Sequence, residues 1–183
     1  MTRHATLTHL LLCALFAALT AVCSAISIPL PFTPIPVNLA TLSVFLAGGL
    51  LGWKYGTISQ MIYVLMGAVG IPVFHSFTGG LGVLAGPTGG YIFGYITAAF
   101  LTGLIIHFFK KETSIPVLAI AMSFGMLSCY LLGTIWFMVS TGAGLAAALL
   151  VCAAPFLLGD GLKIVIGCML VKKLRPLLIK TKI

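Results

Sequence analysis

Long apolar stretches alternate along the chain with short connections that hold most of its polar residues. A helix needs about 20 consecutive apolar residues to cross the roughly 30 Å hydrocarbon core of a bilayer. The stretches that approach this length are Leu7–Ile28, Val37–Trp53, Tyr55–Phe74, Gly89–Phe109, Ile115–Val139 and Leu145–Val171. The pattern predicts an all-α integral membrane protein in which six transmembrane helices form a single domain over residues 1–183.

The composition agrees with a membrane protein and excludes a soluble domain. Of the 183 residues, 61% are hydrophobic and only 7% are charged, too few charges to cover the surface of a soluble domain. The net charge is +8. No basic face with interleaved aromatic residues lies outside the C-terminal tail, so we do not expect nucleic-acid binding.

The positive charges fall in alternate connections. Every Lys and Arg except Lys163 lies in the N-terminal tail, at Lys54, in the Lys110–Glu112 link or in the C-terminal tail, and the intervening connections carry none. Cytoplasmic connections of membrane proteins are enriched in Lys and Arg. We therefore expect both termini to be cytoplasmic. An even number of spans agrees with this, because it puts both termini on the same side of the membrane.

Asp160 and Lys163 are the only charges inside any of the apolar stretches. Three positions apart on a helix, they share a face, and Asp160 would lie about 18 Å deep if its helix leaves the membrane at Lys172. Such a charge is costly unless it is paired or faces a protein-lined cavity. Either the pair neutralises itself and fixes helix packing, or it holds a polar ligand. We favour the ligand, because the carboxylate accepts and the ammonium donates hydrogen bonds.

Two longer connections lie on the side without positive charge. Four prolines within Ile28–Pro36 predict a stiff extended crossing. The glycine-rich connection His75–Thr88 carries apolar side chains, which favours a lid over the outer mouth of a pocket; a floppy solvent loop is the alternative.

Thr88 is the expected N-cap of the fourth helix, whose start is either simply capped or suited to an anion.

Small residues recur at spacings of four along the first stretch: Ala14, Ala17, Ala18, Ala21 and Ala25. Such a stripe lets another helix approach closely. It either packs within this protein or docks an outside partner.

Enzyme motifs are missing from the sequence. No G-x-x-x-x-G-K-[ST] occurs, so the chain itself does not hydrolyse ATP through a P-loop, and the Ser/His or His/His/Glu sets of membrane proteases are absent. No His stands at ligand spacing from another His, a Cys or an acid. We expect no enzyme activity, metal or other cofactor.

The residues leave open a self-sufficient, proton-coupled secondary transporter of a small anionic solute, with Asp160 as the proton carrier.

Several short motifs occur together in the chain, in Ile28–Leu42, Leu46–Gly52, Gly70–Phe74, Gly79–Gly82, Gly86–Tyr91 and Pro155–Lys163. With them the chain resembles, along almost its whole length, the BioY family of biotin-binding S components of energy-coupling factor transporters. This resemblance implies six membrane helices around a vitamin site open to the outside, in the plasma membrane of a prokaryote. It implies as partners biotin, membrane lipid, a transmembrane coupling protein and two ATPase subunits.

The resemblance also implies functional residues. Asp160 and Lys163 would contact the ureido ring of biotin, whose N–H groups donate and whose C=O accepts. The other vitamin-site positions that it implies are Asn38, Phe74, Thr78, Gly80, Gly82, Gly89 and Tyr91, and the stripe that docks the coupling protein is Ala14 and Ala18. Many members carry a basic residue where this chain has Thr78. This leaves Lys163 or the helix start Thr88–Tyr91 as the partner of the biotin carboxylate.

Overall fold

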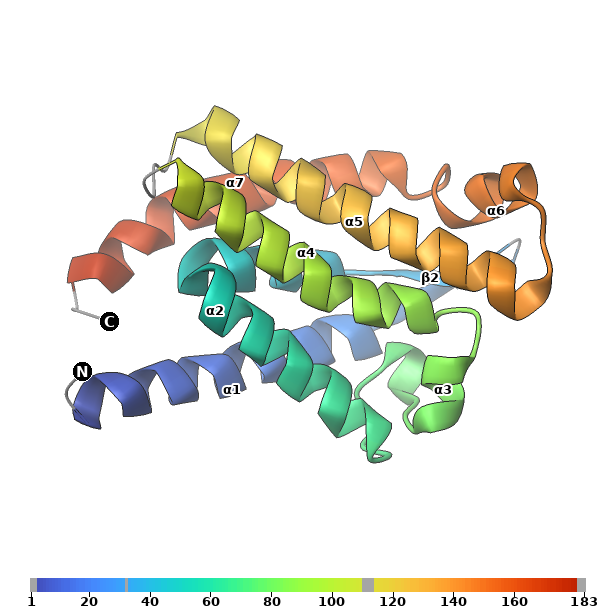
Figure 1. The fold of residues 1–183 in the computed structure, drawn as a ribbon, viewed down its shortest axis with the longest axis horizontal. Helices are drawn as coiled ribbons and strands as arrows, with labels where there is room; N and C mark the ends of the chain where they lie inside the picture. Colours follow the sequence, from blue (N-terminus) through green and yellow to red (C-terminus); the bar gives the residue numbers. More distant parts are fainter. Residues whose placement is uncertain (1–2, 32, 110–113, 181–183) are drawn as a thin grey trace.

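The computed structural model describes residues 3–31, 33–109 and 114–180. The predicted cytoplasmic link Lys110–Glu112, Lys182 and the side chain of Arg3 lie outside the described part of the chain. The elements are α1 (Arg3–Ala25), β1 (Ser27–Leu30), β2 (Thr33–Asn38), α2 (Ala40–Ala68), the 3₁₀ helix η1 (His75–Phe77), α3 (Leu81–Ala85), α4 (Gly89–Phe108), α5 (Ile115–Thr141), α6 (Leu145–Cys152) and α7 (Leu157–Lys180). The start of α1 and the end of α7 lie at the same end of the molecule (Figure 1).

Close packing of α4 against both α2 and α5 forms the centre of the bundle, and α1 packs on α2. Small residues allow the approach of α2 and α4. A Cβ at Gly48 would lie 2.5 Å from the backbone oxygen of Ala99, closer than any side chain tolerates. Both helices contribute buried residues to the two hydrophobic clusters of the bundle.

The second and third predicted stretches form one element, α2, which breaks at Gly52. Gly52 has φ 77° and ψ 180°, angles that glycine adopts without the steric cost of a Cβ. The sequence placed this link at Lys54, slightly too late. The six predicted stretches therefore correspond to α1, the two halves of α2, α4, α5 and the pair α6–α7.

The last predicted stretch is not one continuous helix. Between the end of α6 at Cys152 and the start of α7 at Leu157 the helix direction changes by 51°. Pro155 lies in this turn, where it offers no N–H to a helix and disfavours helical angles in the residue before it. The break corrects the sequence prediction, and it makes Asp160 a first-turn residue of α7.

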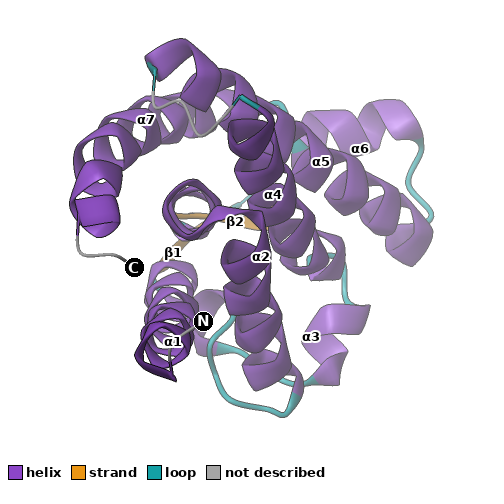
Figure 2. Cartoon of the chain, turned by 60° about the vertical axis from the view of Figure 1, so that its left-hand side comes forward, coloured by secondary structure: helices purple, strands orange, loops and turns teal. Residues whose placement is uncertain are grey.

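The proline-rich connection is extended, as predicted, and it forms a short β-hairpin in a mostly helical chain. β1 and β2 pair antiparallel, with Ser27 opposite Asn38 and Ile28 opposite Val37. The prolines stand at positions between the paired residues, where their missing N–H is not needed. Ile35 of β2 is buried among the helices, and Figure 2 shows both strands surrounded by them.

The connection His75–Thr88 is folded and contains η1 and α3. The N–H of Gly80 donates to the carbonyl of Gly67 at 2.7 Å. Phe74, which precedes the connection, is fully buried with its ring against Gly67. These contacts disagree with a floppy solvent loop, while movement as a lid stays a prediction.

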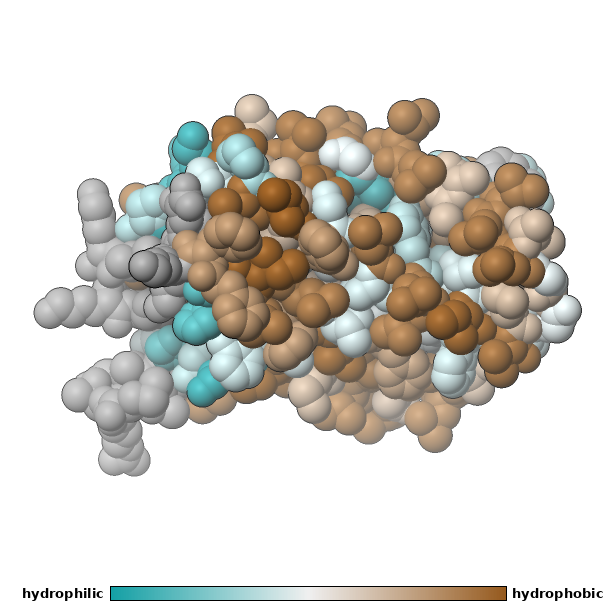
Figure 3. All heavy atoms as spheres, turned by 45° about the horizontal axis from the view of Figure 1, so that its top comes forward, coloured by the Kyte–Doolittle hydropathy of each residue, from teal (hydrophilic) through white to brown (hydrophobic). Residues whose placement is uncertain are grey.

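The flanks of the molecule are apolar and one end is polar. Leu11, Leu127 and Leu131 are each at least 60% exposed. Figure 3 shows hydrophobic residues over most of the visible face and hydrophilic ones near the end that holds the termini. Among the described residues, α1, α4 and α5 are long and apolar enough to cross a membrane, and the bent pair α6–α7 is a fourth candidate. Apolar surface of this extent is suited to lipid.

Candidate functional site

A cavity of about 600 Å³, including the solvent at its opening, lies among the helices. The lining residues are Ser24 of α1; Ile35, Pro36 and Asn38 of β2; Thr41 of α2; His75 and Thr88 of the connection before α4; Tyr91, Ile92 and Tyr95 of α4; Met126, Cys129 and Tyr130 of α5; and Phe156, Asp160 and Lys163 at α7. Segments far apart in the sequence therefore build one site.

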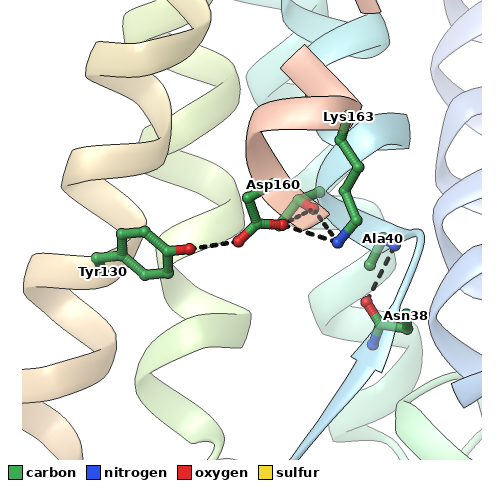
Figure 4. Close-up of polar contacts among 6 residues, drawn as sticks. Asn38, Ala40, Tyr130, Asp160 and Lys163 are labelled. Carbon is green, nitrogen blue, oxygen red and sulfur yellow. Dashed lines mark hydrogen bonds and ion pairs between the residues drawn. The ribbon is translucent and has the colours of Figure 1, made fainter. Parts of the chain in front are cut away.

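Asp160 and Lys163 lie on the wall of this cavity and bond to each other. Lys163 Nζ is 2.8 Å from Asp160 Oδ1, and the two residues are only 9% and 5% exposed. Tyr130 donates its hydroxyl to Asp160 Oδ2 at 2.5 Å, and Lys163 donates to Thr41 Oγ1 at 3.1 Å. Figure 4 shows the chain of contacts from Tyr130 through Asp160 to Lys163. The pair thus neutralises itself and also faces a cavity, and binding of a polar ligand by the pair stays a prediction.

The break before α7 helps to hold the carboxylate. Because α7 begins at Leu157, Asp160 lies in its first turn, and its backbone N–H donates to the carbonyl of Phe156 at 2.8 Å. The positive end of a helix dipole stabilises a nearby anion by about 0.3–1 kcal/mol. Lys163, one turn further on, points to the same side because residues three apart are neighbours on a helix.

Tyr91 forms another part of the wall, and a glycine makes room for it. A Cβ added to Gly133 of α5 would lie 2.4 Å from the Tyr91 ring, so the ring packs directly on the α5 backbone. Its hydroxyl donates to the carbonyl of Cys152 at 2.7 Å. This bond links α4 to the end of α6, directly before the turn that leads to Asp160.

Asn38 lies where β2 meets α2. Its side-chain oxygen accepts the N–H of Ala40 at 3.1 Å (Figure 4), which satisfies one of the free donors at a helix start. The bond holds the junction that presents Thr41 to Lys163.

His75 and Thr88 line the cavity from the connection before α4, which lies at the end of the molecule away from the chain termini (Figure 1). His75 Nε2 and Thr88 Oγ1 are 3.2 Å apart, and partial burial lowers the pKa of His75, so its ring is mostly neutral at pH 7. Thr88 occupies the N-cap position of α4, but its side chain makes no capping bond. The N–H groups of Gly89 and Tyr91 already donate to backbone carbonyls, so an anion here would meet the side chains of His75 and Thr88 and not these N–H groups.

Of the predicted vitamin-site residues, the structure brings Asp160, Lys163, Tyr91 and Asn38 together on the cavity wall. The others are not among its lining residues: Phe74, Thr78, Gly80, Gly82 and Gly89. Thr78 donates its hydroxyl to the carbonyl of His75 at 2.7 Å, and a Cβ at Gly89 would clash with the carbonyl of Leu84. Thr78 and Gly89 therefore help to hold the connection in place, and direct contact with a ligand stays a prediction for all five residues.

Sequence reasoning missed Thr41, Tyr130, Tyr95 and His75 as lining residues. Thr41 follows the Asn38 motif closely, and that proximity was a usable signal. Tyr130 and Tyr95 are polar aromatic residues inside apolar stretches, and nothing in their local sequence shows which way they point. Only the packing of α4 against α5 and of α5 against α7 reveals it.

The alanines of α1 divide between two faces. Ala17 and Ala25 are buried against the bundle, whereas Ala14 and Ala18 are exposed. One side of the stripe therefore packs within the protein. The side with Ala14 and Ala18 lies on the surface of the protein, where another protein can contact it.

Fold and cavity together define a helical, membrane-embedded protein with a site for a small polar ligand. The sequence model of the BioY family matches residues 1–180, and the chain belongs to that family. The resemblance seen in the sequence motifs is thereby confirmed.

Relatives and a solved structure cover nearly the whole chain. The chain is 40% identical over 163 residues to the biotin transporter BioY of Thermotoga maritima, covering 89% of this chain and 93% of the relative. It is 37% identical over 164 residues to a probable biotin transporter BioY of Pyrococcus horikoshii, with coverages of 90% and 94%. The crystal structure of the S-component for biotin from an ECF-type ABC transporter superposes with a TM-score of 0.88 at 30% identity, covering 96% and 95% of the two chains.

Proposed function

We propose that this protein binds biotin as the substrate-specific subunit of an ATP-driven vitamin uptake transporter. The Asp160–Lys163 pair on the wall of a cavity of about 600 Å³ carries this assignment. The ureido ring of biotin presents N–H donors and a C=O acceptor. It meets an acceptor in Asp160 and a donor in Lys163 at a single place. The names of the relatives and of the solved structure support biotin as the ligand.

The ligand lies with its ureido ring at the ion pair and its carboxylate toward His75 and Thr88. Asp160 and Lys163 have no net charge together, so a neutral ring bound there leaves no unbalanced charge buried. A carboxylate bound there would leave one. At the other end, Thr88 offers a hydroxyl and His75 a ring nitrogen. The apolar middle of biotin lies against side chains such as Ile92, Met126 and Phe156.

In the membrane, α1, the two halves of α2, α4, α5 and α6–α7 form six spans with both termini in the cytoplasm of a prokaryote. The basic tails and the position of both chain ends at one polar end support this arrangement (Figures 1 and 3). A transmembrane coupling protein docks on Ala14 and Ala18, and two ATPase subunits supply the energy. The membership of the superposed structure in an ECF-type ABC transporter supports these partners.

Calorimetry on the purified full-length chain in detergent tests the ligand. Biotin is expected to bind with saturable heat at one site per chain, without nucleotide or ion gradient. Desthiobiotin, which keeps the ureido ring and the carboxylate, is expected to bind, and riboflavin is expected to give no heat. Equal binding of riboflavin, or no binding of biotin, contradicts the proposal.

Transport assays separate this proposal from the proton-coupled alternative. As a subunit of an ATP-driven importer, the protein needs its coupling partner and ATPases for uptake of labelled biotin. A self-sufficient transporter instead takes up biotin alone, a protonophore abolishes that uptake, and Asp160→Asn binds the substrate without transporting it. This pattern in cells without the coupling protein contradicts the importer assignment.

A further inference from the structure

A second cavity, of about 530 Å³, lies at the end of the molecule that holds the chain termini. It is lined by Trp53, Lys54 and Tyr55 of α2, His107 near the end of α4, and Arg175 near the end of α7. Both α4 and α7 end on this side (Figure 1). The cavity shares no lining residue with the one around Asp160 and Lys163.

Arg175 is a buried cation in the wall of this second cavity. It is only 7% exposed, and its Nη1 has no hydrogen-bond partner. Such a buried donor is costly unless a ligand satisfies it. Among the described residues the only acid is Asp160, which is bonded to Lys163 in the other cavity; Glu112 lies outside them. The planar guanidinium is suited to bind two oxygens of one anionic group.

The other lining residues also favour an anion at the membrane surface. Lys54 Nζ lies 5.1 Å from the centre of the Trp53 ring, and both residues begin the second half of α2, where the helix dipole attracts negative charge. Trp and Tyr side chains are enriched where membrane meets water. Figure 3 shows hydrophilic residues near the end of the molecule at which α4 and α7 end, next to the apolar flanks.

We propose that this cavity binds the phosphate of an anionic phospholipid, with Arg175 as its main donor and Lys54 as a second cation. Basic pockets between membrane helices on the cytoplasmic side are suited to anionic headgroups. A free phosphate ion has the same oxygens. A lipid, however, also supplies acyl chains that lie along the apolar flank beside the pocket.

The test uses the full-length chain in neutral detergent and measures thermal unfolding with added phosphatidylglycerol, phosphatidylcholine or inorganic phosphate. Phosphatidylglycerol is expected to raise the midpoint, and phosphatidylcholine is not. Arg175→Met keeps the unbranched stem and removes the charge. This variant is expected to need about tenfold more phosphatidylglycerol for the same shift, as the loss of a charged hydrogen bond predicts. Lys173→Met, which removes an equal charge from an exposed position of the same helix, is expected to respond like the unaltered chain.

An equal response of Arg175→Met and the unaltered chain overturns the proposal, and so does an equal loss in Lys173→Met. Stabilisation by inorganic phosphate as strong as that by phosphatidylglycerol overturns the assignment to a lipid. If Arg175→Met does not elute as a single species in gel filtration, native mass spectrometry of the unaltered chain decides. Preferential retention of one phosphatidylglycerol over phosphatidylcholine supports the site, and equal retention overturns it. None of these readouts depends on biotin.

Discussion

Asp160 and Lys163 cancel each other's charge at 2.8 Å, and Tyr130 and Thr41 add hydrogen bonds to the same two groups. A neutral ring can exchange hydrogen bonds with this set without a change in buried charge. Removal of either Asp160 or Lys163 does change the buried charge. Breaking a buried pair leaves an uncompensated charge and costs about 3–5 kcal/mol. At the scale of single residues, this pair is therefore expected to govern both the affinity for biotin and the stability of the protein.

Lys163→Ala is expected to weaken biotin binding by at least about 100-fold, because it removes a charged donor and leaves Asp160 unpaired. Calorimetry measures the affinity, and thermal unfolding shows whether the variant is folded. Lys172→Ala, on the same helix but exposed and outside the cavity, is the control and is expected to bind normally. Unchanged affinity in Lys163→Ala removes the pair from the binding site.

Biotin affinity is expected to rise as the pH falls from 7 to about 5.5. Burial lowers the pKa of His75 below its ordinary value of 6.5, so the free site holds a mostly neutral ring. A carboxylate bound nearby favours the protonated ring and raises this pKa. Binding then takes up a proton, which increases affinity by at most about tenfold per pH unit. Titrations at several pH values measure it. His75→Gln is expected to abolish the trend and His107→Gln, outside this cavity, to keep it; a trend that survives in His75→Gln contradicts the proposed orientation.

The stability of the ligand-free protein is expected to change in the opposite direction. Because the pKa of His75 is lower in the folded state than in the unfolded chain, the unfolded chain binds the proton more tightly. The contribution of His75 is complete above about pH 6.5 and is lost as the pH falls below that value. The thermal midpoint of the unaltered chain is therefore expected to fall on acidification more than that of His75→Gln. An equal fall in both chains contradicts this role.

At the scale of elements, interruptions of regular helix shape the site. The turn around Pro155 starts α7 just before Asp160, and the hairpin carries Asn38 and Ile35 into the bundle. Glycines on α5 and α2 let neighbouring helices and rings come close. The glycines that flank Asp160 behave differently. Gly159 and Gly161 are exposed, do not line the cavity, and a Cβ on either would meet nothing within 4 Å.

Gly133→Ala is expected to weaken biotin binding and to destabilise the protein by about 1–3 kcal/mol through overpacking. The added methyl group would lie 2.4 Å from the Tyr91 ring, which must then move away from the Cys152 carbonyl. Calorimetry and thermal unfolding measure the two effects. Gly159→Ala is the matched control, also in a helix, and is expected to bind normally with slightly higher stability. Equal behaviour of the two variants contradicts the role of Gly133.

At the scale of the whole molecule, separate regions have separate roles. These regions are the apolar flanks, the polar end and the two cavities. We propose that the central cavity takes biotin and that the cavity around Arg175, on the side of the termini, takes a lipid headgroup. Helix α1 lies at the edge of the bundle, where it packs on α2. Its exposed alanines therefore offer a smooth surface that is independent of the ligand cavity.

Ala14→Trp combined with Ala18→Trp is expected to abolish uptake of labelled biotin in cells that contain the coupling protein, while biotin binding to the purified chain is unchanged. The large rings prevent the close approach that small residues allow. Leu127→Trp with Leu131→Trp, on the exposed face of α5, is the control and is expected to keep uptake. Normal uptake in the alanine variants means that the coupling protein docks elsewhere.

The sequence by itself determined the membrane character, the positions of the helical stretches and the Asp160–Lys163 pair. Each of these depends on composition or on neighbours within about one helical turn, and a buried charge in an apolar stretch needs no alignment to be noticed. The family motifs added Tyr91 and Asn38. Local sequence also contained the signals for both breaks, Gly52 and Pro155, although their consequences were not predicted.

Only the tertiary structure decided which distant residues meet around the pair. Thr41 and Tyr130 reach Asp160 from positions 119 and 30 residues away, and their direction depends on how α2 and α5 pack against α7. The same holds for His75 in the ligand cavity and for Arg175 at the second cavity. Their contacts arise between elements whose rotation is set by close packing of whole helices, and no pattern within one helix specifies that rotation.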